Sequence, residues 1–312
     1  MARQGHRVWA TRLTVCFLIA TGVAGVSAYW IWNRIANEST TKPALNLLEP
    51  KSGESNAKKE NDDQSDVHAL DPVLDFARTA LRNHIENHND YTAVLAKREL
   101  VGGRLIPESK MAMKLKYGPP ISSDRSERSV SVYLKSLEPK SQAGREVIWV
   151  QGRNDNKLTA HEAGLLGLIS VDLMPESRLA MAGNRYPITE IGLEKLLGKL
   201  IERGERDRKL GPAIVRITEN IPLGNRNCRL IEIVHESKTV TIQDKTVEFE
   251  FYLAQIFIDL DLLLPLKYAS FSWPKSEGGA PELLEEYTYL DVRLNVGLGE
   301  KDFDTKNPAY RF

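Results

Sequence analysis

Short runs of β-branched and aromatic residues recur through the C-terminal two thirds of the chain, and they constrain its fold more than any other feature. Turn-favouring Gly, Pro, Asn and Asp residues separate them. The runs read YTAVLAKREL, KMAMKLKYG, SVSVYLKSL, REVIWVQGR, AIVRITEN, RLIEIVHES and TVEFEFYLAQIFID. In the last run Val247, Phe249 and Phe251 alternate with Glu248 and Glu250, which is typical of a strand with one face in water. The pattern predicts a long antiparallel sheet, with a Gly-Gly turn joining the first two runs.

Two helices are predicted beside the sheet. The first begins at Asp71-Pro72, where an N-cap acceptor precedes a proline, and ends near His88. The second is capped by Thr189 and ended by Gly204. Their apolar stripes are Leu74, Ala77, Leu81 and Ile85, and Leu193, Leu196, Leu197, Leu200 and Ile201. This order of elements favours an α+β fold, in which a large curved antiparallel sheet forms an open half-barrel covered by helices.

The N-terminus combines basic residues with a long apolar run. Three arginines precede residues 13–33, which are uncharged and, as a helix, span about 30 Å, the hydrocarbon thickness of a bilayer. Residues 1–36 are therefore predicted to be a cytoplasmic stub and a transmembrane anchor in the inner membrane, with the rest of the chain in the periplasm. Val26-Ser27-Ala28 leaves open a signal peptide, whose cleavage would release the domain into the periplasm.

The remainder divides into a linker and one exported domain. Residues 37–70 are polar and lack aromatic side chains, which predicts a disordered linker, and residues 71–312 form the domain. The chain carries 42 Lys and Arg against 42 Asp and Glu, so its net charge does not favour a nucleic-acid partner. Cys16 and Cys228 are the only cysteines, which excludes a disulfide framework.

Asp259 and Asp261 lie inside an apolar run, IFIDLDLLLPLKYASF. Two residues apart on a strand, their carboxylates would point to one face, where they could bind a metal ion or share a proton. Pro265 follows closely, however, and strands rarely continue through proline. We therefore interpret Asp259 and Pro265 as parts of a structural turn between two strands.

His84 and His88 have the spacing of two metal ligands on one helix face. Two histidines at a helix C-terminus are also favourable without a metal, because they interact with the helix dipole. The sequence shows no G-x-S-x-G, no G-x-G-x-x-G and no phosphate-binding loop. Neither a catalytic residue nor a metal or cofactor is predicted, and a metal-dependent hydrolase using His84 and His88 or the two aspartates stays as a minor alternative.

Over most of their length, residues 71–312 resemble the bacterial domain-of-unknown-function family 1571. The matching elements, which follow one another in the same order, are Asp259 before Leu264-Pro265, the Tyr287-Thr288-Tyr289 strand, Asn295 with Gly297, Asp302-Phe303, and Asn307-Pro308. That family is in turn similar to the LolA/RseB-type lipoprotein-carrier fold. The resemblance implies an open half-barrel with helices across its mouth, an apolar cavity for acyl chains and no catalytic residues.

These observations favour a membrane-tethered envelope protein that binds an acyl chain, a lipid or a lipoprotein in an apolar cavity. A concave apolar site needs few polar groups, which suits a sequence without a catalytic constellation. The residues expected to line it are Val147, Trp149, Val247, Phe249 and Phe251. A regulatory or scaffolding domain that binds an envelope protein without lipid is the alternative from another functional class.

Overall fold

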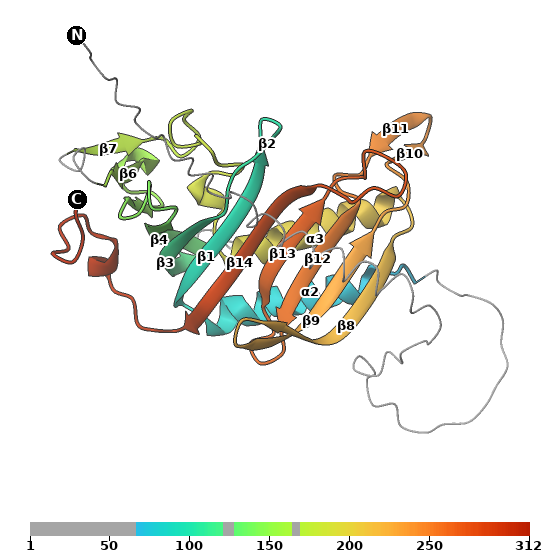
Figure 1. Ribbon diagram of the computed structural model, residues 1–312. Coiled ribbons are helices and arrows are strands. Elements are labelled where there is room, and N and C mark those ends of the chain that lie inside the picture. Colours follow the sequence, from blue (N-terminus) through green and yellow to red (C-terminus); the bar gives the residue numbers. More distant parts are fainter. Residues whose placement is uncertain (1–66, 121–127, 164–168) are drawn as a thin grey trace, which may run out of the picture. The chain divides into compact units, whose positions relative to one another are not determined.

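The computed structural model describes residues 67–120, 128–163 and 169–312 (Figure 1). The predicted anchor at residues 13–33 and most of the linker predicted at residues 37–70 lie outside these ranges. Among the residues that are described, no helix is both long enough and apolar enough to cross a membrane.

The fold is built on one large antiparallel sheet. Its strands are β1 (Asp90–Val101), β2 (Arg104–Leu105), β3 (Ser109–Pro120), β4 (Arg128–Glu138), β5 (Glu146–Val150), β6 (Leu158–His161), β7 (Ser170–Leu173), β8 (Ile214–Leu223), β9 (Arg226–Val234), β12 (Leu253–Asp259), β13 (Pro265–Phe271) and β14 (Leu283–Leu294). The spatial order is β7-β6-β5-β4-β3-β1-β14-β13-β12-β9-β8, and β2 pairs with β1. Strands β10 (Thr239–Ile242) and β11 (Lys245–Glu248) form a separate hairpin.

The first and the last strand meet in the centre of this sheet. The chain runs outward from β1 through β3, β4, β5 and β6 to β7, and a helix then carries it across to β8. It returns through β9, β12 and β13 to β14, which pairs with β1 so that Tyr91 lies opposite Leu294. The hairpin predicted at the Gly-Gly turn is confirmed: Gly102 and Gly103 both have positive φ, which glycine adopts without a steric penalty.

Two α-helices, α2 (Asp71–Asn87) and α3 (Leu193–Leu210), lie across one face of the sheet (Figure 1). The antiparallel sheet with covering helices predicted from the sequence is thereby confirmed. Helix α2 buries Leu74, Ala77, Ala80 and His84, whereas the predicted stripe ended with Leu81 and Ile85. The polar His84 takes the buried position because aromatic rings surround it, with Tyr117 in edge contact at a centroid distance of 5.5 Å.

The prediction that Gly204 ends the second helix is wrong. Helix α3 continues to Leu210, and Gly204 lies at its contact with α2, where a Cβ atom would come within 2.8 Å of Cδ2 of Leu74. This glycine therefore allows the two helices to approach each other. The helix start also differs from the prediction, because Thr189 lies in a short 3-10 helix, η3 (Ile188–Glu190), and Gly192 precedes the first residue of α3.

The run TVEFEF does not form one continuous strand. Strand β11 ends at Glu248 and β12 begins at Leu253, so residues 249–252 lie outside both strands. The backbone N–H of Phe249 donates to the carbonyl of Lys238, and the N–H of Tyr252 donates to that of Phe271. The chain is thus fixed at both ends of this segment.

In the described ranges, three clusters of buried side chains stabilise the domain. The larger core lies on the helix-covered face and contains Tyr91, Leu95, Met113, Leu115, Val132, Trp149, Leu193, Leu197, Leu266 and Tyr289. The smaller core consists of Leu70, Leu74, Ile231, Ile233, Phe251, Ala254, Ile256, Ile258 and Tyr268. A third cluster joins the chain's C-terminal segment to the other face of β4 and β5, where Phe303 packs with Tyr133 and Ile148.

Candidate functional site

A cavity of about 40 Å³ lies between α2, α3 and strands β9, β12 and β13, inside the smaller core. Its lining residues are Leu70, Val73, Leu74, Phe76, Ala77, Leu197, Leu200, Arg203, Gly204, Asp207, Ile231, Ile233, Phe251, Ala254, Ile256, Ile258 and Tyr268. A single water needs roughly 10–15 Å³ of such space, so the cavity is the size of about three waters. Since its wall is almost wholly apolar, it favours hydrocarbon over water.

The cavity follows from the local sequence. Each of α2 and α3 presents a small residue to it, Ala77 and Gly204, and β12 contributes Ala254 between larger neighbours. Ile231 and Ile256, which are cross-strand partners on β9 and β12, form part of its floor. Branched side chains are stiff and cannot swing into the gap that the small residues leave.

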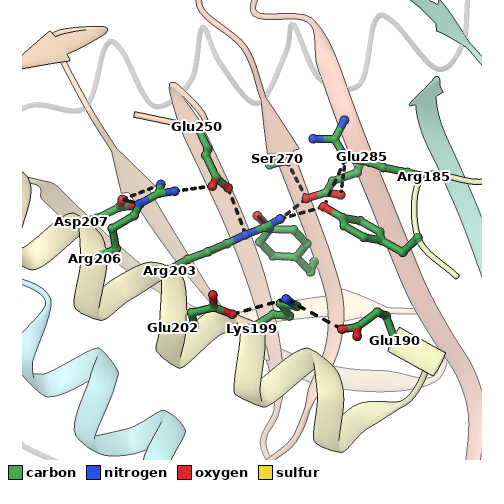
Figure 2. A network of polar contacts seen from close by, with 12 residues as sticks. Arg185, Glu190, Lys199, Glu202, Arg203, Arg206, Asp207, Glu250, Ser270 and Glu285 are labelled. Atoms are coloured by element: carbon green, nitrogen blue, oxygen red, sulfur yellow. Dashed lines mark hydrogen bonds and ion pairs between the residues drawn. The ribbon is translucent and has the colours of Figure 1, made fainter. Parts of the chain in front are cut away.

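One end of the cavity is polar and centres on Arg203 of α3 (Figure 2). Its guanidinium donates hydrogen bonds of 2.8 Å to the hydroxyls of Tyr268 and Tyr186 and one of 2.9 Å to Glu285 Oε1. Its Nε atom lies 3.3 Å from Glu250 Oε2. Although burial lowers the pKa of Arg203, the neighbouring Tyr268 and Glu285 raise it above its usual value. Arg203 is therefore a permanent cation beside an apolar space.

Glu285 of β14 is the buried carboxylate of this end and is only 1% exposed. It accepts from Arg203 and, at 3.4 Å, from the hydroxyl of Ser270. Arg185 approaches its other oxygen as an ion pair, with Nε 3.2 Å from Oε2 but outside hydrogen-bonding geometry. A carboxylate this deeply buried stays charged only beside a cation. The contact between Arg203 and Glu285 therefore ties α3 to the middle of the sheet.

A second group of polar contacts extends from α3 toward β9. Nε2 of His235 lies 3.1 Å from Oδ2 of Asp207, and both side chains are buried. Arg206 donates to Oδ1 of Asp207 and also to Glu250 (Figure 2). The His235 ring stacks on Phe249, with ring centroids 3.9 Å apart. We call the charged members Arg185, Arg203, Arg206, Asp207, Glu250 and Glu285 the salt-bridge network.

The five predicted cavity residues lie in four different places in the structure. Phe251 lines the cavity. Phe249 is buried beside it and stacks on His235. Val247 lies in the separate β10–β11 hairpin, opposite Val240. Trp149 belongs to the larger core and Val147 packs against that core, so neither lines the cavity.

Asp259 and Pro265 lie at the hairpin between β12 and β13. Asp259 Oδ1 accepts hydrogen bonds from the backbone N–H groups of Asp261, at 2.9 Å, and Leu262, at 2.7 Å. The Asp261 side chain is 87% exposed while that of Asp259 is 1% exposed, so the two carboxylates do not form a pair on one strand face. These contacts are those of a side chain that stabilises a turn.

Replacing Asp259 by alanine is expected to lower the free energy of unfolding by about 1–3 kcal/mol, because two turn N–H groups lose their acceptor. The free energy of unfolding is measured by urea denaturation of the parent chain and of the variants Asp259→Ala and Asp261→Ala. Asp261 is exposed, so its variant should stay within about 0.5 kcal/mol of the parent chain. Equal losses in the two variants would contradict the turn role.

His84 and His88 lie close together, with 3.1 Å between their Nδ1 atoms. Nε2 of His84 lies 3.4 Å from the hydroxyl of Tyr117, and Arg128 donates to the backbone carbonyl of His88. Burial, together with His88 and Arg128, lowers the pKa of His84 to about 3. In the described ranges no group of three or more His, Cys, Asp or Glu side chains is placed to hold a metal ion. The arrangement is that of a neutral histidine pair packed beside an arginine.

A family model described as "Protein of unknown function (DUF1571)" matches residues 88–312. The chain belongs to this family, which confirms the resemblance found in the sequence. A comparison with curated proteins gives no match.

The chain is similar, at low identity, to a number of solved structures, of which three are given. A DUF1329 family protein from Desulfovibrio piger is 12% identical, with a TM-score of 0.36 over 77% of this chain and 98% of that one. A putative outer membrane lipoprotein-sorting protein domain from Vibrio parahaemolyticus is 13% identical, with a TM-score of 0.34 over 74% and 95%. A LolA superfamily protein from Nitrosomonas europaea is 12% identical, with a TM-score of 0.27 over 73% and 97%. Similarity of this degree assigns neither a ligand nor a residue role to this chain.

The sequence contains a signal for the polar end of the cavity, although the predicted helix ends before one of its residues, Asp207. The apolar stripe predicted for the second helix ends with Leu200 and Ile201, before Gly204. Helical spacing continues that stripe through Arg203 and Asp207. Charged residues on a buried helix face require buried partners, so they mark a site.

Proposed function

We propose that the domain binds the acyl chain of a lipid or lipoprotein in the cavity between α2, α3 and the sheet. In this proposal the sheet acts as an open half-barrel, and residues 13–33 tether the domain to the inner membrane so that it faces the periplasm. The observation that carries the proposal is the composition of the cavity wall, which is apolar except at the end formed by Arg203, Asp207 and Tyr268. Small-molecule sites have this composition.

A cavity of about 40 Å³ is far smaller than an acyl chain, so binding requires one of its walls to move. Two of the walls are helices that contact each other through a glycine, and one is the Phe251 side chain from a segment outside the strands. A displacement of either kind would extend the cavity through the smaller core without breaking the hydrogen bonds of the sheet.

The test is native mass spectrometry of the full chain purified from bacterial membranes, followed by solvent extraction of any bound lipid. We expect an adduct with the mass of an acyl lipid. The variant Ala254→Phe fills the cavity and should lose the adduct, whereas the same change at the exposed Ala309 should retain it. Near-ultraviolet circular dichroism shows whether both variants fold. A chain that carries no lipid and takes up none when lipid is added would refute the proposal.

A second candidate function is the binding of an envelope protein partner without lipid. The observation that favours it is a set of exposed apolar side chains in and on either side of the edge strand β7, namely Ile169, Val171, Met174 and Leu179. Exposed apolar side chains can mark an interaction site. A lipid-free chain that loses a co-purifying partner on substitution of Ile169 and Leu179 by serine would support this function.

A further inference from the structure

Glu250 occupies a position between two arginines of α3. Its Oε2 lies 3.3 Å from Nε of Arg203, and its Oε1 accepts from Nη1 of Arg206 (Figure 2). The Glu250 side chain is 48% exposed, whereas the other two carboxylates of the salt-bridge network, those of Asp207 and Glu285, are each 2% exposed in their ion pairs. Of these carboxylates, Glu250 can leave the network most easily, because its half-exposed side chain can move directly into water and be hydrated there.

The residue after Glu250 fills the apolar part of the same site. Phe251 is 4% exposed and lines the cavity whose polar end is formed by Arg203 and Asp207. Both Glu250 and Phe251 lie between β11 and β12, and the backbone hydrogen bonds that fix this segment are made by Phe249 and Tyr252 at its ends. A carboxylate bound to arginines and an apolar group in the cavity thus come from two adjacent residues.

The charges of the network show what the departure of Glu250 would leave behind. Arg185, Arg203 and Arg206 are balanced by Asp207, Glu250 and Glu285. Without Glu250, Arg203 keeps Glu285 and Arg206 keeps Asp207, and the network carries one uncompensated positive charge. A single negative charge restores the balance. Arginine forks bind carboxylate and phosphate oxygens with favourable geometry.

We infer that Glu250 and Phe251 act as an internal substitute for a ligand, and that the ligand is an amphiphile with a singly charged anionic head. The head group would take the place of the Glu250 carboxylate between Arg203 and Arg206, and the acyl chain would take the place of the Phe251 ring in the cavity. This inference rests on the proposed function and specifies the class of lipid. Displacement of the Phe251 ring would enlarge the cavity of about 40 Å³, because that ring is one of its walls.

The experiment uses the full chain in bacterial membranes and two photoreactive probes of equal length, palmitate and hexadecanol carrying a diazirine in the chain. The concentration that gives half-maximal labelling is measured for each probe, and mass spectrometry locates the crosslinks. We expect palmitate to label residues of the cavity wall at lower concentration than hexadecanol. Hydrogen bonds to charged groups are strong enough for a difference of about tenfold.

Two variants separate the head-group site from the cavity. Glu250→Gln removes the competing carboxylate and should lower the half-maximal concentration of palmitate about tenfold, while Arg206→Gln should raise it about tenfold. Neither change should alter hexadecanol labelling. The matched controls are Glu248→Gln, an exposed glutamate paired with Lys238, and Arg208→Gln, an α3 arginine paired with Asp71. Both controls should label like the parent chain.

Competition with unlabelled molecules distinguishes the source of the anionic head. Displacement of the palmitate probe by free palmitate alone identifies a fatty-acid carboxylate, and displacement by phosphatidylglycerol identifies a phospholipid phosphodiester. Displacement by inorganic phosphate or acetate at the same concentrations would overturn the inference, because it would show that no acyl chain is required.

The inference and the proposed function fail in different ways. If palmitate and hexadecanol label the cavity equally and Glu250→Gln changes neither, the anionic head is refuted while acyl binding stands. If neither probe labels the cavity in any variant, acyl binding itself is refuted. Circular dichroism of each purified variant excludes unfolding as the cause of lost labelling.

Discussion

Replacing Arg203 by methionine is expected to lower the free energy of unfolding by about 3–5 kcal/mol, because the buried Glu285 loses its hydrogen-bonded cation and keeps only the ion pair with Arg185. Arg203 donates to Glu285 at 2.9 Å, and the glutamate side chain is 2% exposed. Methionine keeps most of the length and apolar stem of arginine, so the loss reports mainly on charge. Urea or guanidinium denaturation at neutral pH measures it.

Two further variants make this result specific. Arg208→Met on the same helix breaks an exposed ion pair with Asp71 and should cost less than about 1 kcal/mol. The double variant Arg203→Met with Glu285→Gln removes both charges and should recover a large part of the loss. If Arg203→Met unfolds within 1 kcal/mol of the parent chain, the contact with Glu285 does not hold α3 to the sheet.

Lowering the pH is expected to destabilise the domain through His84. Its pKa is about 3 in the folded state against an ordinary value of 6.5, and burial is the main cause. Between these values the unfolded chain binds a proton that the folded chain does not, so the free energy of unfolding falls as the pH falls through this window. The contribution of His84 is at most about 1.4 kcal/mol per pH unit. The pKa of His88 is also lowered by burial, which adds in the same direction.

Denaturation between pH 6.5 and 5 tests this, because most exposed carboxylates remain ionised there. The variant His84→Leu should show a shallower dependence on pH than the parent chain. Tyr117→Phe removes the hydroxyl next to His84 Nε2 but keeps the ring buried, so it should keep the steep dependence. An unchanged slope in His84→Leu would show that another group is responsible.

The sequence predicts most of the sheet because strand signals are local. Alternation and turn residues correctly place the β1–β3, β4–β5 and β12–β13 hairpins. The end of α3 is predicted wrongly because Gly204 has two opposite interpretations. A glycine can end a helix or allow close helix contact, and only the position of Leu74 across the contact decides between them. The break after β11 is hidden for a similar reason, since Phe249 and Phe251 fit a strand and a buried loop equally well.

The candidate site is less predictable than the fold. Only Phe251 of the five expected residues lines the cavity, because the cavity depends on where two helices cross β9, β12 and β13. Val147 and Trp149 also face a core, but it is the larger one. Glu250 has the sequence pattern of a water-facing strand residue. The sequence does not show that Arg203 and Arg206, which belong to the distant helix α3, lie beside Glu250 in the fold.

The pairing of the first strand with the last has a consequence for how the protein reaches its folded form. Neither β1 nor β14 can complete the middle of the sheet until almost the entire domain has been synthesised, since Tyr91 must find Leu294. Such contacts between distant segments slow folding and leave strand edges and apolar faces open in the meantime. A chain synthesised from its N-terminus would therefore expose an incomplete half-sheet until β14 has been made, and over that interval it would be prone to aggregation.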